Sequence, residues 1–222
     1  MLDAGAMRVK LALTALGLAG FLAFGCSTNP VPSLVPPQVI EMDAETLERF
    51  LGEIDKYVLL RRSVLAHLRA ATANSSAEQV STRQRASTEA VVAYRRGKKR
   101  GNIFTRDAEA AIRRTLGREF SGPGGPAIIK GVKQGNPMDE GNPSPSDPRK
   151  DVKSTMILAV NAIYPDAAPA SNVPPSLLLK LPPLPEEVRY GFIGRALILR
   201  DSEANVILDF IPGVVPAPSI RR

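Results

Sequence analysis

The sequence has very few of the side chains that bind metals or form disulfides. Its 222 residues include one Cys, one His and no Trp, and aromatic residues make up only 5%. An internal disulfide needs two Cys, so none can form within this chain. Zinc, iron–sulfur and haem sites take several Cys or His ligands. One residue of each kind is too few, so we expect neither a metal nor a cofactor.

Two motifs of common enzymes are also missing from the sequence. Gly-x-Ser-x-Gly, the turn that presents a nucleophilic serine, does not occur, so His67 lacks the setting of a Ser-His-Asp catalyst. The glycine-rich residues 122–125 lack the Gly-Lys-Ser/Thr ending of a phosphate-binding loop. The sequence therefore predicts a protein that is not an enzyme.

The remaining composition is that of a globular domain with long irregular stretches. Hydrophobic residues make up 44% and charged residues 23%, which is typical of a chain with a packed core. The 20 Pro and the low aromatic content indicate that this core is modest. The formal net charge of +7 favours anionic partners such as phosphates or acidic lipid headgroups.

The N-terminal segment has the three parts of a secretory signal peptide. Arg8 and Lys10 form a short positive region, an uncharged run follows over residues 11–25, and small residues precede Cys26. At about 1.5 Å per residue this 15-residue run spans about 22 Å, short of the ~30 Å hydrocarbon core. We therefore expect an exported protein. Because an acidic residue precedes the positive region, Met7 is the expected true start.

The end of this segment resembles the lipobox of bacterial lipoproteins. Gly25 and Cys26 fit that motif, in which a small residue precedes an invariant Cys. In the family this Cys is diacylated, with palmitate among the acids expected, and becomes the new N-terminus, so the resemblance implies a membrane anchor on Cys26. Ala23 and Phe24 depart from the usual motif and also suit a general signal peptidase, so cleavage without lipid is the alternative. Ser27 in place of Asp implies the outer membrane rather than the inner one, with the chain facing the periplasm.

We expect one α+β domain behind a tether. Four Pro in residues 27–38 favour an extended polyproline conformation. The predicted parts are a signal peptide (1–25), a lipidated Cys with a Pro-rich tether (26–38), a helical part (39–121), a flexible Gly/Pro-rich insert (122–151), a C-terminal part with a β-meander (152–215) and a tail (216–222).

Apolar residues at three-and-four spacing predict about three amphipathic helices in the helical part. The first runs from its N-cap Asp43 to about residue 68, and its apolar stripe contains one charged residue, Arg61. The second begins at Ser75 or Ser76 with a capping box and runs to about residue 96. Thr105 caps the third, which ends near residue 120.

Three short runs near the C-terminus alternate with a period of two and predict a small antiparallel meander. They are residues 188–193, 195–200 and 206–211, separated by turns at Gly194 and at 201–205. In the third run, Val206, Leu208 and Phe210 are expected on one side. A brief helix is expected within residues 174–181, and 156–164 suits either a strand or a helix.

This C-terminal segment resembles an uncharacterised family of bacterial hypothetical envelope proteins. The family pattern combines Leu-Pro-x-Leu-Pro, Tyr-x-Phe-x-Gly, Leu-x-Leu-x-Asp and Ala-x-x-Ile-x-Asp. The matching residues are Tyr190, Phe192, Gly194, Leu197, Leu199, Asp201, Ala204, Ile207 and Asp209. The turn at residues 101–105 is also similar. The resemblance implies no activity.

Five basic residues follow the second predicted helix within six positions. These are Arg95, Arg96, Lys98, Lys99 and Arg100. Two interpretations stay open: contact with anionic lipid headgroups, or cations that compensate the helix dipole before a solvated loop. No aromatic residue interrupts the run to stack on a base, so we expect no nucleic-acid partner.

Two acids of the predicted sheet, Asp201 and Asp209, are the candidates for a small-ligand or hydrolytic site. Residues 201–205 also resemble the start of a calcium loop, but Val206 and Pro212 stand where that loop needs Gly and Glu. A polar hairpin turn is therefore the preferred interpretation.

Together these features predict a membrane-anchored lipoprotein that acts as a non-catalytic adaptor or structural factor of the cell envelope. Its expected partners are the membrane, through lipid on Cys26, and an envelope protein. The alternatives are a periplasmic small-ligand-binding or hydrolytic protein that uses Asp201 or Asp209, and a binder of anionic membrane surfaces through residues 95–100.

Overall fold

The structure is a computed structural model that describes residues 41–68, 74–134, 136, 158–164 and 173–217. All of them lie within one of the two units of the chain, residues 37–222. The predicted signal peptide, Cys26 and the tether lie outside the described residues, as does most of the predicted insert. None of the helices in the described part is long and apolar enough to cross a bilayer.

The three helices predicted within residues 43–120 begin at the predicted capping side chains. Asp43 accepts a hydrogen bond from the Thr46 amide at 2.8 Å, Ser76 forms a capping box with Gln79, and Thr105 caps the third helix. The three predicted helices and the brief one are confirmed. The helices of the described chain are α1 (Ala44–Leu65), α2 (Ala77–Tyr94), α3 (Arg106–Ser121), α4 (Gly125–Lys133) and α6 (Pro175–Leu178).

The prediction of a flexible insert beginning at residue 122 is wrong for residues 125–133, which form α4. A proline in its first turn suits a helix start, because the missing N–H has no helical partner there. Val132 is fully buried on its inner side. Gly125 lies so close to the carbonyl of Phe120 that a side chain would overlap it, so the tight α3–α4 turn requires glycine.

The predicted meander is confirmed as a three-stranded antiparallel sheet in the order β1-β2-β3. Its strands are β1 (Val188–Ile193), β2 (Ala196–Asp201) and β3 (Ile207–Ile211). Gly194 adopts φ +55° in the two-residue turn between β1 and β2, a conformation that costs glycine little. Together with the helices, this sheet confirms the predicted α+β class.

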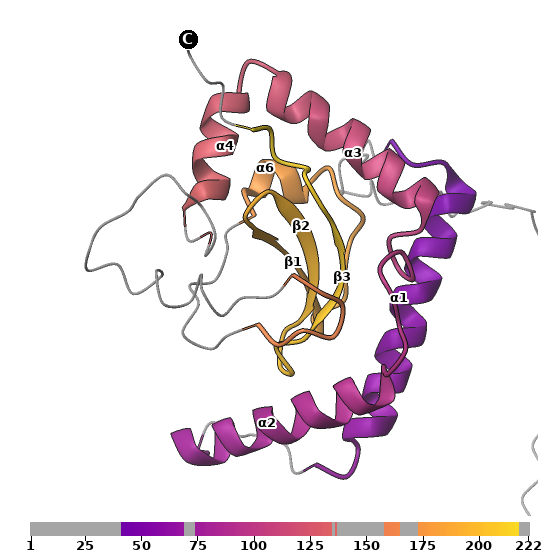
Figure 1. Ribbon diagram of the computed structural model, residues 1–222, viewed down its shortest axis with the longest axis vertical. Helices are drawn as coiled ribbons and strands as arrows, with labels where there is room; N and C mark the ends of the chain where they lie inside the picture. Colours follow the sequence, from indigo (N-terminus) through magenta and orange to yellow (C-terminus); the bar gives the residue numbers. More distant parts are fainter. Residues whose placement is uncertain (1–40, 69–73, 135, 137–157, 165–172, 218–222) are drawn as a thin grey trace, which may run out of the picture. The chain divides into compact units, whose positions relative to one another are not determined.

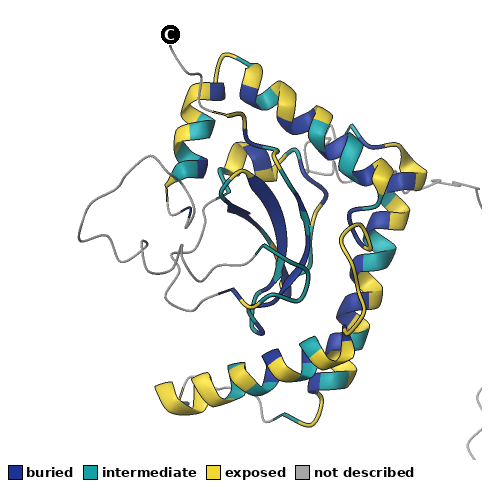
Figure 2. Ribbon diagram, viewed as in Figure 1, coloured by how far each residue is buried: buried dark blue, intermediate teal, exposed yellow. Residues whose placement is uncertain are grey.

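Both faces of the sheet are buried, as the dark strands of Figure 2 show. One face joins the main core with Phe50, Phe104 and Leu116 of the helical part. The other packs Ile193, Ile198 and Ile207 of the sheet with Tyr164. The helices cover the first face, with α2 near the β2–β3 turn (Figure 1).

Residues 158–164 contact the second face without forming a helix or a named strand. Ile163 forms an isolated antiparallel bridge with Val206, and the Tyr164 amide donates to the Asn205 carbonyl at 2.7 Å. This short segment therefore continues the sheet by a single bridge beside the start of β3.

The predicted placement of Phe210 on the same side as Leu208 is wrong. Leu199 pairs with Asp209 but Arg200 pairs with Ile207, so Leu208 is an extra residue in β3. This β-bulge shifts the alternation by one position. Leu208 packs in the main core, whereas Phe210 packs against the cluster on the opposite face.

Candidate functional site

The carboxylate of Asp201 is fully buried and bound by residues of α1 and of its own turn. One oxygen accepts from the Tyr57 hydroxyl at 2.5 Å and from Arg61 Nε at 2.7 Å. The other accepts from the backbone amides of Glu203 and Ala204 at 2.8 and 2.7 Å. These four donors occupy the acceptor sites of the carboxylate, so Asp201 holds the β2–β3 turn against α1.

The ionisation of the groups around Asp201 follows from burial and charge. Burial, together with the negative charge of Asp201, raises the pKa of the Tyr57 hydroxyl. Burial opposes the charged form of Arg61, but Asp201 and Glu203 outweigh it and raise the pKa of its guanidinium. Tyr57 therefore stays a proton donor and Arg61 stays a cation, which is the arrangement that a structural carboxylate needs.

The ion-pair network continues from Arg61 to α2. Glu203 accepts from Arg61 at 2.6 Å, pairs with Arg83 at 2.6 Å and accepts from the Ser87 hydroxyl at 3.2 Å. Thr88 donates to the Ala204 carbonyl at 2.6 Å. One hairpin turn thus joins α1, α2 and the sheet.

Asp209 is also fully buried, and its donors come from the loop that leads into α3. The amides of Gly101, Ile103 and Phe104 donate to its carboxylate at 2.8 to 3.1 Å, and the Phe210 amide donates at 2.9 Å. The bulge at Leu208 places this side chain on the face that the loop covers. Asp201 and Asp209 share none of these donors, so the two acids form separate structural contacts rather than one site.

Arg95 is separated from the other four cations of the basic run. It is 4% exposed, and its guanidinium donates to the Leu208 carbonyl at 2.7 Å and to Asn161 at 3.0 Å. The guanidinium also lies over the Tyr57 ring at 5.2 Å. Burial lowers its pKa. The expectation that Arg95 contacts an anionic surface is therefore corrected: it is a core residue.

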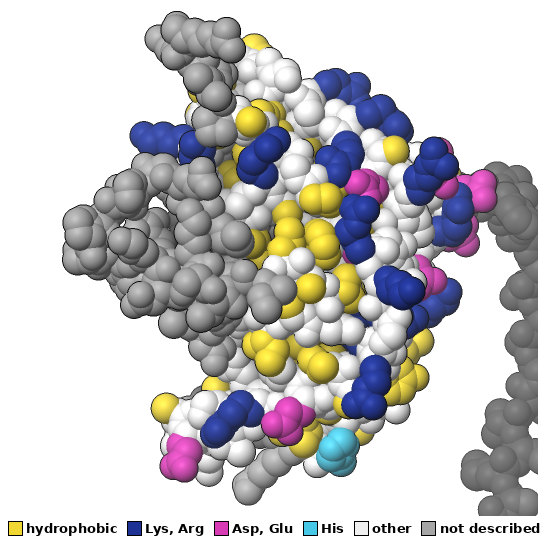
Figure 3. Space-filling view, viewed as in Figure 1, with side chains coloured by type: hydrophobic (Ala, Val, Ile, Leu, Met, Phe, Trp, Pro, Cys, Tyr) yellow, Lys and Arg dark blue, Asp and Glu magenta, His cyan; other side chains and the backbone are white. Residues whose placement is uncertain are grey.

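The remaining cations of the run lie on the surface. Arg96, Lys98 and Lys99 are exposed, whereas Arg100 lies 3.6 Å from Glu109 and over the Phe210 ring. Other Lys and Arg side chains are spread over α1 and α3 in Figure 3, so positive charge is not confined to this loop. A candidate contact surface is thus reduced to Arg96, Lys98 and Lys99.

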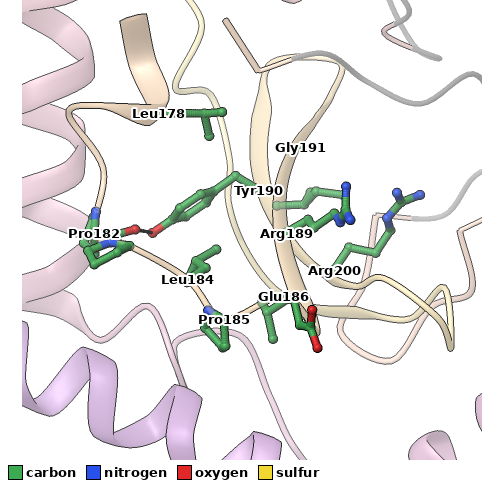
Figure 4. Close-up of a pocket in the computed structure, with 12 residues that line it drawn as sticks. Leu178, Pro182, Leu184, Pro185, Glu186, Arg189, Tyr190, Gly191 and Arg200 are labelled. Carbon is green, nitrogen blue, oxygen red and sulfur yellow. Dashed lines mark hydrogen bonds between the residues drawn. The ribbon is translucent and has the colours of Figure 1, made fainter. Parts of the chain in front are cut away.

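A pocket of about 560 Å³ opens beside β1, at residues that the sequence did not indicate as a binding site (Figure 4). The pocket is apolar at one end and basic at the other. Tyr190 lies at the apolar end, and its hydroxyl donates to the Pro182 carbonyl at 3.1 Å. The apolar lining comprises Leu178, Pro182, Pro183, Leu184, Pro185, Val188, Tyr190, Gly191 and Ile198, and the charged lining comprises Glu186, Arg189 and Arg200.

The two arginines of this pocket face each other across neighbouring strands. Arg189 of β1 pairs with Arg200 of β2 in the register of the sheet. Their side chains extend in the same direction, away from Tyr190 and Pro182 (Figure 4). Arg200 is half-buried and its guanidinium stacks 4.5 Å from the centre of the Tyr164 ring.

Two further residues that hold the turns of the sheet were not identified from the sequence. They are Arg61, at the β2–β3 turn, and Asn136, at the β1–β2 turn. Arg61 had a detectable signal, since it is the one charged residue in an apolar stripe and such a residue needs a buried partner. Asn136 had none: it is 3% exposed, donates to the Gly194 carbonyl at 2.7 Å and accepts from its amide at 2.8 Å. Nothing local in a Gly- and Pro-rich stretch indicates that one Asn fixes the β1–β2 turn.

Within the described part of the chain, no group of three or more His, Cys, Asp or Glu residues is placed to hold a metal ion. Cys26, the predicted lipidation site, lies outside the described residues. Comparison with known proteins gives no family model, no curated protein and no solved structure that matches this chain.

Proposed function

We propose that this protein is an exported lipoprotein, anchored through lipid on Cys26, whose folded part is a non-catalytic adaptor of the cell envelope. The sequence motivates the anchor through its lipobox-like end and its Pro-rich tether. The anchor would hold the folded part near the membrane, facing the periplasm, with the outer membrane favoured.

The observation that carries the non-catalytic part of this proposal is the occupancy of the buried acids. General acid–base catalysis needs a carboxyl group that can exchange a proton with a substrate. Asp201 and Asp209 instead accept from donors of their own chain at every available position. This arrangement disfavours the alternative that uses these two acids for catalysis or for ligand binding.

Fatty-acid labelling tests the anchor. The protein is expressed in a two-membrane bacterial host with labelled palmitate, beside a Cys26→Ala variant. We expect label on the unchanged protein and none on the variant. Equal absence of label on both would overturn the lipoprotein proposal and indicate a lipid-free product, either cleaved and secreted or held by an uncleaved signal peptide.

Cross-linking tests the adaptor role. We expect the anchored protein to co-purify with a defined envelope protein after gentle cross-linking, and the Cys26→Ala variant to lose this partner because it lacks the lipid that places it. A known envelope complex, cross-linked in the same cells, serves as the control. Recovery of that control without any partner of this protein would count against an adaptor.

A second candidate function, binding to anionic membrane surfaces, is favoured by the exposed groups that follow α2. Tyr94 is 59% exposed and adjoins the cations Arg96, Lys98 and Lys99. An amphipathic ring beside basic side chains is a common composition at membrane interfaces. This role would supplement the lipid anchor.

Binding to vesicles that contain anionic lipids distinguishes a dedicated contact surface from nonspecific attraction between a basic protein and an acidic membrane. Each basic residue near an anionic surface contributes about 1 kcal/mol, so Arg96→Gln/Lys98→Gln/Lys99→Gln should weaken binding on the order of 100-fold. The control Arg106→Gln/Arg114→Gln/Lys130→Gln removes three exposed cations elsewhere. Equal effects of the two triple variants, or binding that resists salt, would contradict a dedicated surface.

A further inference from the structure

Arg189 of β1 and Arg200 of β2 carry positive charge that no carboxylate of the described residues neutralises. Like charges directly opposite each other in a sheet destabilise it. Arg189 and Arg200 occupy such a pair, and no carboxylate of the described residues lies within ion-pair distance of either. Glu186 lines the same pocket but is exposed and pairs with neither. The pair therefore costs stability that a bound anion would restore.

Arg200 is already oriented for an anion. Its guanidinium stacks on Tyr164, which uses the flat face and leaves the N–H groups at the edge available. Burial lowers its pKa, and the charge of Arg189 acts in the same direction. Two neighbouring guanidinium groups present forked donors that match the oxygens of a carboxylate or a phosphate.

The other end of the pocket suits an apolar group. Leu178, Leu184 and Tyr190 line it with prolines, and the Tyr190 hydroxyl is already bonded to a carbonyl. A volume of about 560 Å³ lies within the ~300–1,000 Å³ usual for small-molecule sites, which are mostly apolar with a few placed polar groups. The volume of the pocket, and the separation of its lining into an apolar end and a basic end, thus indicate a small ligand with one charged end.

We propose that this pocket binds a small amphipathic anion. Its single carboxylate or phosphate would lie between Arg189 and Arg200, and its apolar body would pass over Gly191 and Ile198 and around the free edge of β1 towards Leu184 and the prolines. The site goes beyond the proposed function and does not depend on lipid at Cys26, so the two proposals fail separately.

Calorimetric titration of the complete processed protein tests the site. The probes are 4-phenylbutyrate, 4-phenylbutyl phosphate and neutral 4-phenylbutanol, which share one apolar body and dissolve without forming micelles at working concentrations. A lipidated product is kept in phosphatidylcholine nanodiscs, with empty nanodiscs as the blank. We expect either anion to bind and the alcohol to bind at least about tenfold more weakly, because hydrogen bonds to charged groups contribute strongly. Binding of one anion alone identifies the preferred headgroup.

Four variants locate the binding. Arg189→Gln/Arg200→Gln should weaken the anion about tenfold or more, and Arg189→Lys/Arg200→Lys should keep the charge but lose part of the affinity. Arg106→Gln/Arg114→Gln removes the same charge from exposed positions of α3 and should leave binding unchanged. Thermal unfolding of each variant verifies that it folds. Leu184→Asp places a charge at the apolar end of the pocket, outside the sheet, and should weaken binding of the anion.

Several results would overturn the site. These are no binding of either anion up to about 10 mM, equal affinity for the alcohol, or equal effects of Arg189→Gln/Arg200→Gln and Arg106→Gln/Arg114→Gln. Unchanged binding in Leu184→Asp would also exclude this pocket.

Discussion

At the scale of single residues, Asp209 illustrates how a buried charge is stabilised without a direct ion pair. Its carboxylate accepts from four backbone amides, three of them from the loop that leads into α3. Net contributions of hydrogen bonds to charged groups are about 1.5–3 kcal/mol each, and an unsatisfied buried donor costs a similar amount. Removing the carboxylate would leave several donors without an acceptor.

We therefore expect Asp209→Ala to lower the free energy of unfolding by about 3 kcal/mol or more. Urea titration followed by far-ultraviolet circular dichroism measures the change. Asp55→Ala, at an exposed position of α1, is the matched control and should shift the value by less than about 0.5 kcal/mol. Similar losses in the two variants would mean that the amide contacts add little.

Glu187 should give the protein a specific dependence on acid. Hydrogen bonds from Arg62 at 2.9 and 3.2 Å lower the pKa of its carboxyl below the ordinary 4.5, although burial opposes the shift. Because the pKa of Glu187 is lower in the folded protein than in the unfolded chain, its ionisation stabilises the fold. This stabilisation is fully present above pH 4.5 and is lost as the pH falls through the pKa of the folded protein.

The measurable consequence is a stability difference that depends on pH. At neutral pH the unchanged protein should be more stable to urea than Glu187→Gln, and this difference should shrink as the pH falls below 4.5 and through the lowered pKa of the folded protein. Glu48→Gln, at an exposed site, should show no such trend. A difference that stays constant from neutral to acid pH would exclude the linkage to Arg62.

The arginines show how far a sequence reveals single-residue roles. Arg61 stands out because its neighbours in the helical stripe are apolar, although its partner 140 residues away could not be named. Arg95 gives no such signal, because it is followed by cations that are exposed. Its partners Asn161 and Leu208 come from distant parts of the chain. Local patterns cannot supply that information.

At the scale of elements, helices and strands were predictable where capping and periodicity agree. The caps Asp43, Ser76 and Thr105 and the alternating runs of the meander are local signals, and the structure confirms them. α4 was missed because its Gly and Pro residues are read as turn formers, whereas packing of Val132 overrides that tendency. The bulge at Leu208 was missed because regular alternation assumes that each residue of β3 pairs with one residue of β2, whereas a bulge adds an unpaired residue.

Two glycines of neighbouring helices should respond in opposite directions to substitution by alanine. Gly125→Ala places a methyl group on the Phe120 carbonyl and should lower the free energy of unfolding by about 1–3 kcal/mol or more. Gly117→Ala, within α3 and with open space around it, should raise that free energy by up to about 1 kcal/mol. Thermal unfolding of both variants measures this. Equal shifts would show that the α3–α4 turn can relax.

At the scale of the whole molecule, polar contacts join the helical part to the sheet in several places. The turn 201–205 binds α1 and α2, Asp209 binds the loop before α3, and Arg95 binds Leu208. Helices tied in this way cannot leave the sheet without exposing buried charge. We infer that α1, α2 and the sheet unfold together.

Native-state hydrogen exchange tests this cooperativity. The amides of Phe104 and Ala204 donate to Asp209 and Asp201, so they should exchange only through global opening. A core truncation in the sheet, Leu208→Ala, should reduce protection in α1 and in β2 by the same free energy. Unchanged protection in α1 would indicate that the helical part opens on its own.

The sequence separation of these contacts affects when the chain can fold. Tyr57 and Asp201 are 144 residues apart, and Ile103 and Asp209 are 106 apart. Folding that depends on distant contacts is slow, and it cannot finish until the later segment is present. If the chain is exported while it is being synthesised, α1 enters the translocation channel before Asp201 leaves the ribosome. The precursor would then lack the residues that close its core, which keeps it extended enough to be threaded across the membrane.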